Sequence, residues 1–279
     1  MLRRSVWILL TPLTLILLSP ASAASEYPNR IVSLSPSATE DLFAIGAGKV
    51  VVAVDDNSNY PKQAPKTKLS SFNPSAEAIA KYKPDLVVIQ STATKAAFIV
   101  NQLRSLKIKV YVEKTPADLT GLYKEIMELG DLTGNTSKAK SLVQKIKLAR
   151  LKSIRSVSGS SGKVFHELDN TLYSATSATF IGKVYADFGL TNTADAAAKA
   201  DDGGYPQLQN EYVISANPKY IFLADGQYGE SVAKVAARPG WSSIDAIQNN
   251  KVIVLPADIS SRWGPRIVNF YQAIAHALS

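Results

Sequence analysis

The stretch from Thr136 to Val157 constrains the fold of this chain more than any other feature of the sequence. It runs for about six helical turns without a proline or a glycine. Its apolar residues recur at the helical period, which predicts one long amphipathic helix: Leu142, Val143, Ile146, Leu151 and Ile154. The run SGSSG at residues 158–162 ends it. The regions on either side of this helix have a different pattern, so we expect the helix to separate two domains.

Both regions beside this helix alternate short apolar runs with helical patterns. The run KVVVAV is β-branched and uninterrupted, as in strands covered on both faces. Such alternation predicts parallel βα units. In the first region, strands are predicted at Arg30–Leu34, Lys49–Val54, Leu86–Gln90 and Lys109–Val112, and helices at Ala76–Tyr82, Lys95–Leu106 and Asp118–Leu129. In the second, strands are predicted at Lys163–Leu168, Tyr220–Ala224 and Val252–Leu255, and helices at Thr179–Phe188, Gln207–Ala216 and Arg266–Leu278.

Another helix is predicted after the first strand. Ser37 and Glu40 have the spacing of a capping box, in which the serine caps the helix and the glutamate reaches back to it. Gly46 is expected to end this helix, because glycine readily adopts the left-handed conformation of helix C-termini.

The sequence therefore predicts an α/β protein with two Rossmann-like α/β lobes joined by a single long rigid helix. We expect residues 24–133 to form the N-terminal lobe, 134–158 the linking helix and 159–279 the C-terminal lobe. A length of 279 residues suits two domains of ordinary size. A rigid linker predicts less lobe closure than flexible strand hinges would allow.

The N-terminus, residues 1–23, is predicted to be a secretory signal peptide. Arg3 and Arg4 precede an apolar run, Val6–Leu18, and small residues follow at Ala21-Ser22-Ala23. The run is short for a membrane span, which needs about 20 residues. We expect cleavage after Ala23, with an uncleaved anchor as the alternative. A periplasmic or secreted protein is therefore expected.

Composition excludes several classes of site. The chain has no cysteine, which removes thiol nucleophiles, disulfides, cysteine metal sites and the cysteine of a lipid anchor. Its only histidines are His166 and His276, so a zinc site built on several histidines is excluded and no metal site is expected. The formal net charge is +8, but the basic residues are scattered, which argues against nucleic-acid binding.

One sequence pattern occurs twice, once in each of the two regions beside the long helix. EAIAKYKPDLVVIQS starts at Glu77 and EYVISANPKYIFLAD starts at Glu211, and each continues through a proline into an apolar run. Proline between helix and strand is common in α/β proteins, and an acid near a helix start is favoured by the helix dipole. The repeat is therefore either ordinary α/β patterning or a role performed once by each lobe.

Several segments in order give a family resemblance: RIVSLSPSATEDLFAIG, DDNSNYP, KPDLVV, TFIGKVYADFGLTN, YPQLQNEYVISANPKYIFLAD and RWGPRIV. Across nearly the whole mature chain, the sequence resembles the solute-binding proteins of cobalamin and iron-complex (siderophore, haem) ABC importers. The resemblance implies the class III periplasmic-binding-protein fold, with a bulky ligand held between the lobes. It also implies that an exposed glutamate of each lobe, here Glu77 and Glu211, meets arginines of the membrane permease. Such a protein is expected to be a monomer without enzymatic activity or a resident cofactor.

The ligand site is expected beyond the carboxyl ends of the strands, where parallel α/β layers bind ligands. The first lobe offers Ser35, Pro36, Asn59, Tyr60, Phe72, Gln90 and Ser91, and the second offers Tyr173, Tyr205, Asp258, Arg262 and Trp263. The aromatic faces among them suit a large flat ligand. By resemblance, Asp258 and Arg262 match positions that reach the ligand in cobalamin-binding relatives, although their spacing also allows them to pair with each other. Phe72 and Gln90 stand where those relatives carry tryptophans, which leaves siderophore and haem open.

Two alternatives remain. A haem receptor with Tyr173 or His166 as the axial iron ligand is one. A secreted α/β hydrolytic enzyme is the other, but the chain has no Gly-x-Ser-x-Gly elbow and no phosphate-binding loop. His166 and Glu167 are also poor partners for catalysis, since adjacent strand residues point to opposite faces. No catalytic residue is therefore expected.

Overall fold

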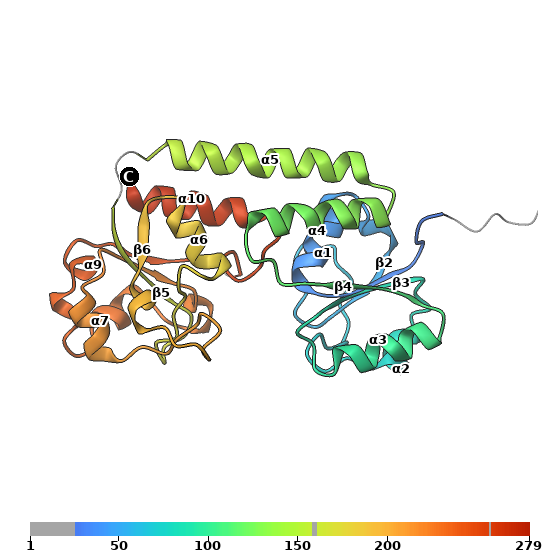
Figure 1. Ribbon diagram of the computed structural model, residues 1–279, viewed down its shortest axis with the longest axis horizontal. Helices are drawn as coiled ribbons and strands as arrows, with labels where there is room; N and C mark the ends of the chain where they lie inside the picture. The colour runs from blue at the N-terminus through green and yellow to red at the C-terminus, as the bar shows by residue number, and fades with distance from the viewer. Residues whose placement is uncertain (1–25, 158–160, 257) are drawn as a thin grey trace, which may run out of the picture.

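The computed structural model describes residues 26–157, 161–256 and 258–279 (Figure 1). The predicted signal peptide, residues 1–23, lies outside these ranges. Within them, no helix combines the length and apolar character needed to cross a bilayer.

The first lobe is a four-stranded parallel sheet with helices on both faces. Its strands are β1 (Ile31–Leu34), β2 (Val51–Val54), β3 (Leu86–Gln90) and β4 (Lys109–Glu113), in the spatial order β2-β1-β3-β4. Its helices are α1 (Pro36–Ala44), α2 (Ala76–Ala80), α3 (Ala96–Ser105) and α4 (Leu119–Leu132). In Figure 1, α1 and α4 lie above the sheet and α2 and α3 below it. Both faces of β3 are therefore buried, in two separate apolar clusters.

The second lobe repeats this arrangement. Its strands are β5 (Gly162–Glu167), β6 (Leu190–Asn192), β7 (Tyr220–Leu223) and β8 (Val252–Val254), in the order β6-β5-β7-β8. Its helices are α6 (Phe180–Ala186), α7 (Asn210–Ala216), α8 (Val232–Ala236), α9 (Asp245–Gln248) and α10 (Ile267–Leu278). Short 3₁₀ helices occupy Gly48–Val50, Thr193–Ala197, Gly226–Tyr228 and Trp241–Ser243. The repeated sequence segments form α2–β3 and α7–β7, so they hold equivalent places in the two lobes.

Helix α5 (Thr136–Arg155) joins the lobes and lies along both of them (Figure 1). It packs against α4 of the first lobe and α10 of the second. Val143 and Ile146 are buried in these contacts, whereas Leu148 and Leu151 are exposed. The predicted fold class, two α/β lobes joined by one long helix, is confirmed.

The predicted capping box is wrong. Ser35, not Ser37, is the N-cap of α1, and its side chain accepts a hydrogen bond from the backbone N–H of Ala38. Pro36 occupies the first helical turn, where its fixed φ and missing N–H are tolerated. Glu40 therefore lies inside the helix and is free to contact the other lobe. The predicted helix end is correct, since Gly46 has a φ of +87°.

Short elements account for the other differences. Strand β6 was not predicted, because its three residues, Leu190–Asn192, give no readable alternation. Residues 49 and 50 belong to a 3₁₀ turn instead of β2. Helix α7 begins at Asn210, later than the predicted Gln207.

Candidate ligand cleft between the lobes

A cavity of about 930 Å³ lies between the lobes. From the first lobe it is lined by Ser35, Pro36, Ser37, Asn57, Asn59, Ser71, Phe72, Gln90, Thr92, Glu113 and Thr115, and from the second by Tyr205, Gln227, Tyr228, Asp258, Ser261, Arg262 and Trp263. Ser35 follows β1, Gln90 ends β3 and Glu113 ends β4. The cavity thus lies at the carboxyl ends of the parallel strands, as predicted.

Aromatic side chains from both lobes line this cleft. Phe72 is 64% exposed on the first-lobe side, and Tyr228 is 82% exposed on the second-lobe side. Trp263 is half-buried and packs on Phe180, with ring centroids 5.6 Å apart. Rings anchored on one side and open on the other can hold a flat apolar ligand by stacking.

Arg262 crosses from the second lobe to the first and is engaged by protein groups there. Its guanidinium donates to Asn59 Oδ1 at 2.8 Å and to the carbonyl oxygen of Asn57 at 2.9 Å. It lies 3.0 Å from the Asp258 carboxylate and 3.6 Å from that of Glu40. The alternative in which Asp258 and Arg262 pair with each other is therefore the one observed.

Glu40 connects the lobes through a second arginine. Arg266 donates to its two carboxylate oxygens at 2.8 and 2.5 Å, and the Glu40 side chain is fully buried. The Arg266 guanidinium lies over the ring of Tyr60, 4.3 Å from the centroid. Tyr60 was predicted to contact the ligand, but it lies against this arginine and does not line the cavity. The bidentate pair fixes the relative position of α1 and the segment before α10.

Glu113 is a cleft residue that the sequence analysis missed. It is only 3% exposed, and among the described residues its Oε2 atom has no hydrogen-bond partner. Asp41 and Glu125 belong to the same buried group of carboxyls. Burial raises the pKa of Glu113, and burial together with Glu113 and Asp41 raises the pKa of Glu125 to about 11. The signal was the position of Glu113 at a strand end beside Gln90, one residue beyond the predicted strand.

The structure brings together most of the predicted ligand residues. Pro36, Phe72, Gln90, Asp258, Arg262 and Trp263 line the cavity, as do Ser35, Asn59 and Tyr205. Tyr173 and Ser91 do not. Tyr173 lies in an isolated bridge with Gln207 and is 41% exposed. Tyr228 and Gln227 were missed because they follow a strand whose loop carried no pattern of its own.

His166 lies in the core of the second lobe, away from the cleft. Its Nδ1 atom is 2.7 Å from the hydroxyl of Tyr185, and burial lowers its pKa to about 3. Its neighbour Glu167 instead meets Arg238, consistent with opposite faces of β5. Of the two axial residues considered for haem, neither His166 nor Tyr173 reaches the cavity. Among the described residues, no cluster of three or more histidine or acidic side chains could hold a metal ion.

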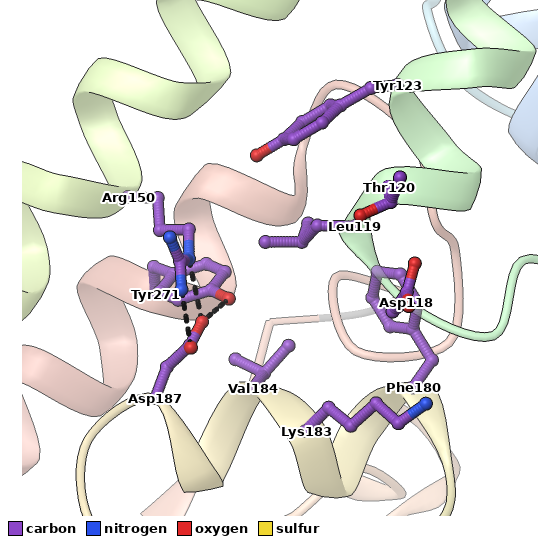
Figure 2. A pocket seen from close by; sticks show the side chains of 10 residues that line it. All are labelled: Asp118, Leu119, Thr120, Tyr123, Arg150, Phe180, Lys183, Val184, Asp187 and Tyr271. Atoms are coloured by element: carbon purple, nitrogen blue, oxygen red, sulfur yellow. Dashed lines mark hydrogen bonds and ion pairs between the residues drawn. The ribbon is translucent and has the colours of Figure 1, made fainter.

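A second pocket, of about 320 Å³, lies beneath α5 where the lobes meet (Figure 2). Figure 2 shows Arg150 of α5, Asp187 and Tyr271 pointing toward one another. Arg150 donates to both carboxylate oxygens of Asp187, and the Tyr271 hydroxyl donates to one of them. Lys183 donates across the lobes to the carbonyl oxygen of Ala117 at 2.9 Å. Both cations are satisfied by the protein, so these contacts brace the linker.

Glu77 and Glu211 occupy matching positions in the two lobes. Each lies in the first turn of its helix, α2 or α7, and each is exposed. Glu77 borders a groove between α2 and α3 in which Phe98 is 58% exposed. Both acids therefore lie on solvent-facing surface, outside the cleft.

Comparison with known proteins agrees with this geometry. A family model described as periplasmic binding protein matches residues 31–259. The chain is 32% identical to an uncharacterized ABC transporter substrate-binding lipoprotein of Bacillus subtilis, over 90% of this chain and 80% of that protein. It is 26% identical to a vitamin B12-binding protein of Vibrio parahaemolyticus, over 90% of each.

Solved structures share the fold. The periplasmic haem-binding protein HutB of Vibrio cholerae superposes with a TM-score of 0.78 at 22% identity, covering 89% of this chain and 98% of that one. The vitamin B12-binding protein BtuF of the same organism gives a TM-score of 0.74 at 24% identity, covering 90% and 96%. The resemblance predicted from the sequence motifs is confirmed, and it supports a binding protein over a hydrolase. The chain belongs to the periplasmic binding protein family.

Proposed function

We propose that this protein is an extracytoplasmic receptor that captures cobalamin or a ferric chelate between its lobes and delivers it to an ABC permease. The observation that carries the proposal is the cleft of about 930 Å³ at the carboxyl ends of both sheets. Its size is at the upper end of small-molecule sites, and exposed rings from both lobes line it.

The relatives support the ligand class. A vitamin B12-binding protein is similar along nine-tenths of this chain, and structures of B12- and haem-binding periplasmic proteins share the fold. These relatives are named for binding vitamin B12 or haem, which are both large ligands. A cavity of about 930 Å³ in this chain suits a ligand of similar size. Pro36, Phe72, Gln90 and Trp263 are the proposed contacts, with Asp258 and Arg262 at the rim.

Permease docking is proposed for Glu77 and Glu211. They are exposed, and they lie at equivalent positions on two lobes held rigidly by α5, Arg266 and Lys183. A single exposed ion pair contributes little, but two fixed points define an orientation and increase the association rate. We propose a monomer in the periplasm. The chain has no cysteine for a lipid anchor, and the haem-binding and B12-binding proteins that share its fold are named periplasmic.

The test is a titration of the chain from residue 24 onward with cobalamin, haem and a ferric siderophore. Binding is measured directly by equilibrium dialysis and by tryptophan fluorescence. Trp263 lines the cleft, whereas Trp241 is fully buried and donates through Nε1 to Asn210. We expect quenching in the native protein and much less in Trp263→Phe, while emission from Trp241 persists.

Ligand binding should also raise the unfolding free energy by about 4 kcal/mol at roughly a thousand times Kd. Absence of binding for all three ligand classes would refute the receptor proposal. Equal quenching in native protein and Trp263→Phe would move the site out of this cleft.

A further inference from the structure

We propose that this cleft selects neutral or positively charged ligands that present hydrogen-bond donors, and that Glu113 sets this preference. The inference rests on the proposed receptor function and narrows its ligand class. It is carried by the charged groups of the cavity wall and by the contacts that they already make.

The charged side chains that line the cavity are two acids and one base. Among the residues that the structure describes, they are Glu113, Asp258 and Arg262, and no lysine or histidine lines the cavity. Recognition of a carboxylate or a catecholate in a cleft requires a cation that can turn toward it. Arg262 is therefore the one lining residue with which an anionic ligand could pair.

Both terminal nitrogens of the Arg262 guanidinium are already engaged by protein groups. It donates to Asn59 and to the backbone of Asn57, and it pairs with Asp258 at 3.0 Å. It is 8% exposed and also lies 3.6 Å from Glu40. An anionic ligand would have to displace Asp258 and would then leave that carboxylate unpaired, which is costly in a partly buried site.

Glu113 differs from Arg262: it is a buried acid of the cavity wall that has no basic partner among the described residues. The side chains of Ser35 and of protonated Glu125 hydrogen-bond to Glu113. The charge of Asp55 acts against its ionisation. Within the described part of the chain, no lysine or arginine is among the groups that act on it. A cation or a hydrogen-bond donor of a ligand in the cleft would therefore meet an acid that no described basic side chain of the protein neutralises.

Chemistry then separates the candidate ligands. Haem carries two propionates, and ferric tricatecholates are strongly anionic, so each brings negative charge to a wall without a free cation. Corrinoids carry peripheral amides whose N–H groups donate, and some ferric trihydroxamates carry a free ammonium. The last two classes match Glu113, and the first two do not.

The experiment measures the affinity of four probes by calorimetry: cyanocobalamin, cationic ferrioxamine B, haem and an anionic ferric tricatecholate. We expect the neutral or the cationic probe to bind at least about tenfold more tightly than either anion. Glu113→Gln should weaken the cationic probe by about tenfold, the neutral probe by less, and the anions not at all. Glu26→Gln, an exposed acid outside the cleft, is the matched control and should change nothing.

Asp258→Asn is the second variant, and it keeps the test decisive if Glu113→Gln fails to fold. It releases Arg262 from its acidic neighbour, so affinity for the anionic probes should rise by several-fold. Tightest binding of an anionic probe by the native protein would overturn the inference and leave the receptor function standing. Equal weakening of every probe by Glu113→Gln would reduce Glu113 to a structural role. If no probe binds, the proposed function fails and this inference fails with it.

Discussion

The two lobes share one strand order but treat a buried glutamate at a strand end differently. In the second lobe, Glu167 at the end of β5 accepts two hydrogen bonds of 2.5 Å from Arg238, which also meets Glu230. In the first lobe, Glu113 at the end of β4 has no such partner and lines the cleft. The strand order is duplicated, but the two acids end different strands of it, because β5 corresponds to β1 and β4 corresponds to β8. The acid of the second lobe is paired with an arginine, whereas the acid of the first lobe lines the cleft without a basic partner among the described residues.

The group behind Glu113 extends this difference. Asp41 and Glu125 are buried in the first lobe, and no described lysine or arginine is among the groups that act on them. In the second lobe, Asp225 is also buried but lies in the field of Arg238. The first lobe thus accepts a larger electrostatic penalty near the cleft, which is common at functional sites.

The largest expected effect tests whether the lobes are equivalent in docking. Reversal of both acids, Glu77→Lys with Glu211→Lys, should abolish uptake by cells and leave ligand affinity unchanged, because both residues lie outside the cleft. Each single reversal should reduce uptake partially and to a similar extent. Uptake is measured with labelled ligand, and affinity with the purified protein. Parallel loss of affinity would exclude docking, and an effect of only one reversal would show that the acids are helix-start residues with unequal roles.

The next largest effect is expected from removing Arg238, the basic partner of Glu167 in the second lobe; among the described residues, Glu113 in the first lobe has no such partner. Arg238→Ala leaves Glu167 buried without its partner and should lower the unfolding free energy by about 3–5 kcal/mol. Arg155→Ala, an exposed arginine at the end of α5, should change it by less than about 0.5 kcal/mol. Urea unfolding at neutral pH makes the comparison. If the two variants were equally stable, Glu167 would not depend on its partner.

The carboxyls of the first lobe predict a pH effect. Burial and neighbouring acids raise the pKa of Glu125 from 4.5 to about 11, so between these values the folded chain keeps a proton that the unfolded chain has lost. Stability must therefore fall as pH rises through this window. Glu125→Gln removes the penalty, and its advantage should grow by about 1 kcal/mol per pH unit. Unfolding curves between about pH 6 and pH 8 test this, and curves that stay parallel to the native protein's would contradict it.

The smallest effect concerns one aromatic side chain from each lobe. Phe72→Ala removes an exposed ring from the cleft and should weaken ligand binding by several-fold, equivalent to about 1 kcal/mol of stacking. Tyr173→Ala should leave affinity within about twofold, because Tyr173 is outside the cavity. The same titration reports both. A larger loss for Tyr173→Ala would show that the bound ligand extends beyond the cleft described here.

Local sequence patterns were sufficient to predict the main strands and helices of both lobes. Uninterrupted β-branched runs predicted the central strands, and the stretch without proline or glycine predicted α5. Because parallel α/β sheets bind ligands at the carboxyl ends of their strands, the sequence predicted that Pro36, Gln90 and Trp263 line one cavity, and they do. The same prediction failed for Tyr60, because a residue at a strand end can still turn toward a protein cation such as Arg266.

By itself, the sequence determined which segments become helix or strand, their repetition in two lobes and the edge of each sheet at which a ligand would bind. These properties follow from periodicity and turn residues within a few positions. Only the tertiary structure decided which charges are satisfied. Arg262 reaches Asn59 across 203 positions and Arg266 reaches Glu40 across 226, while in the described part of the chain no lysine or arginine acts on Glu113. Hydrogen bonding and burial depend on distances in space, and those distances exist only once the lobes have folded and met.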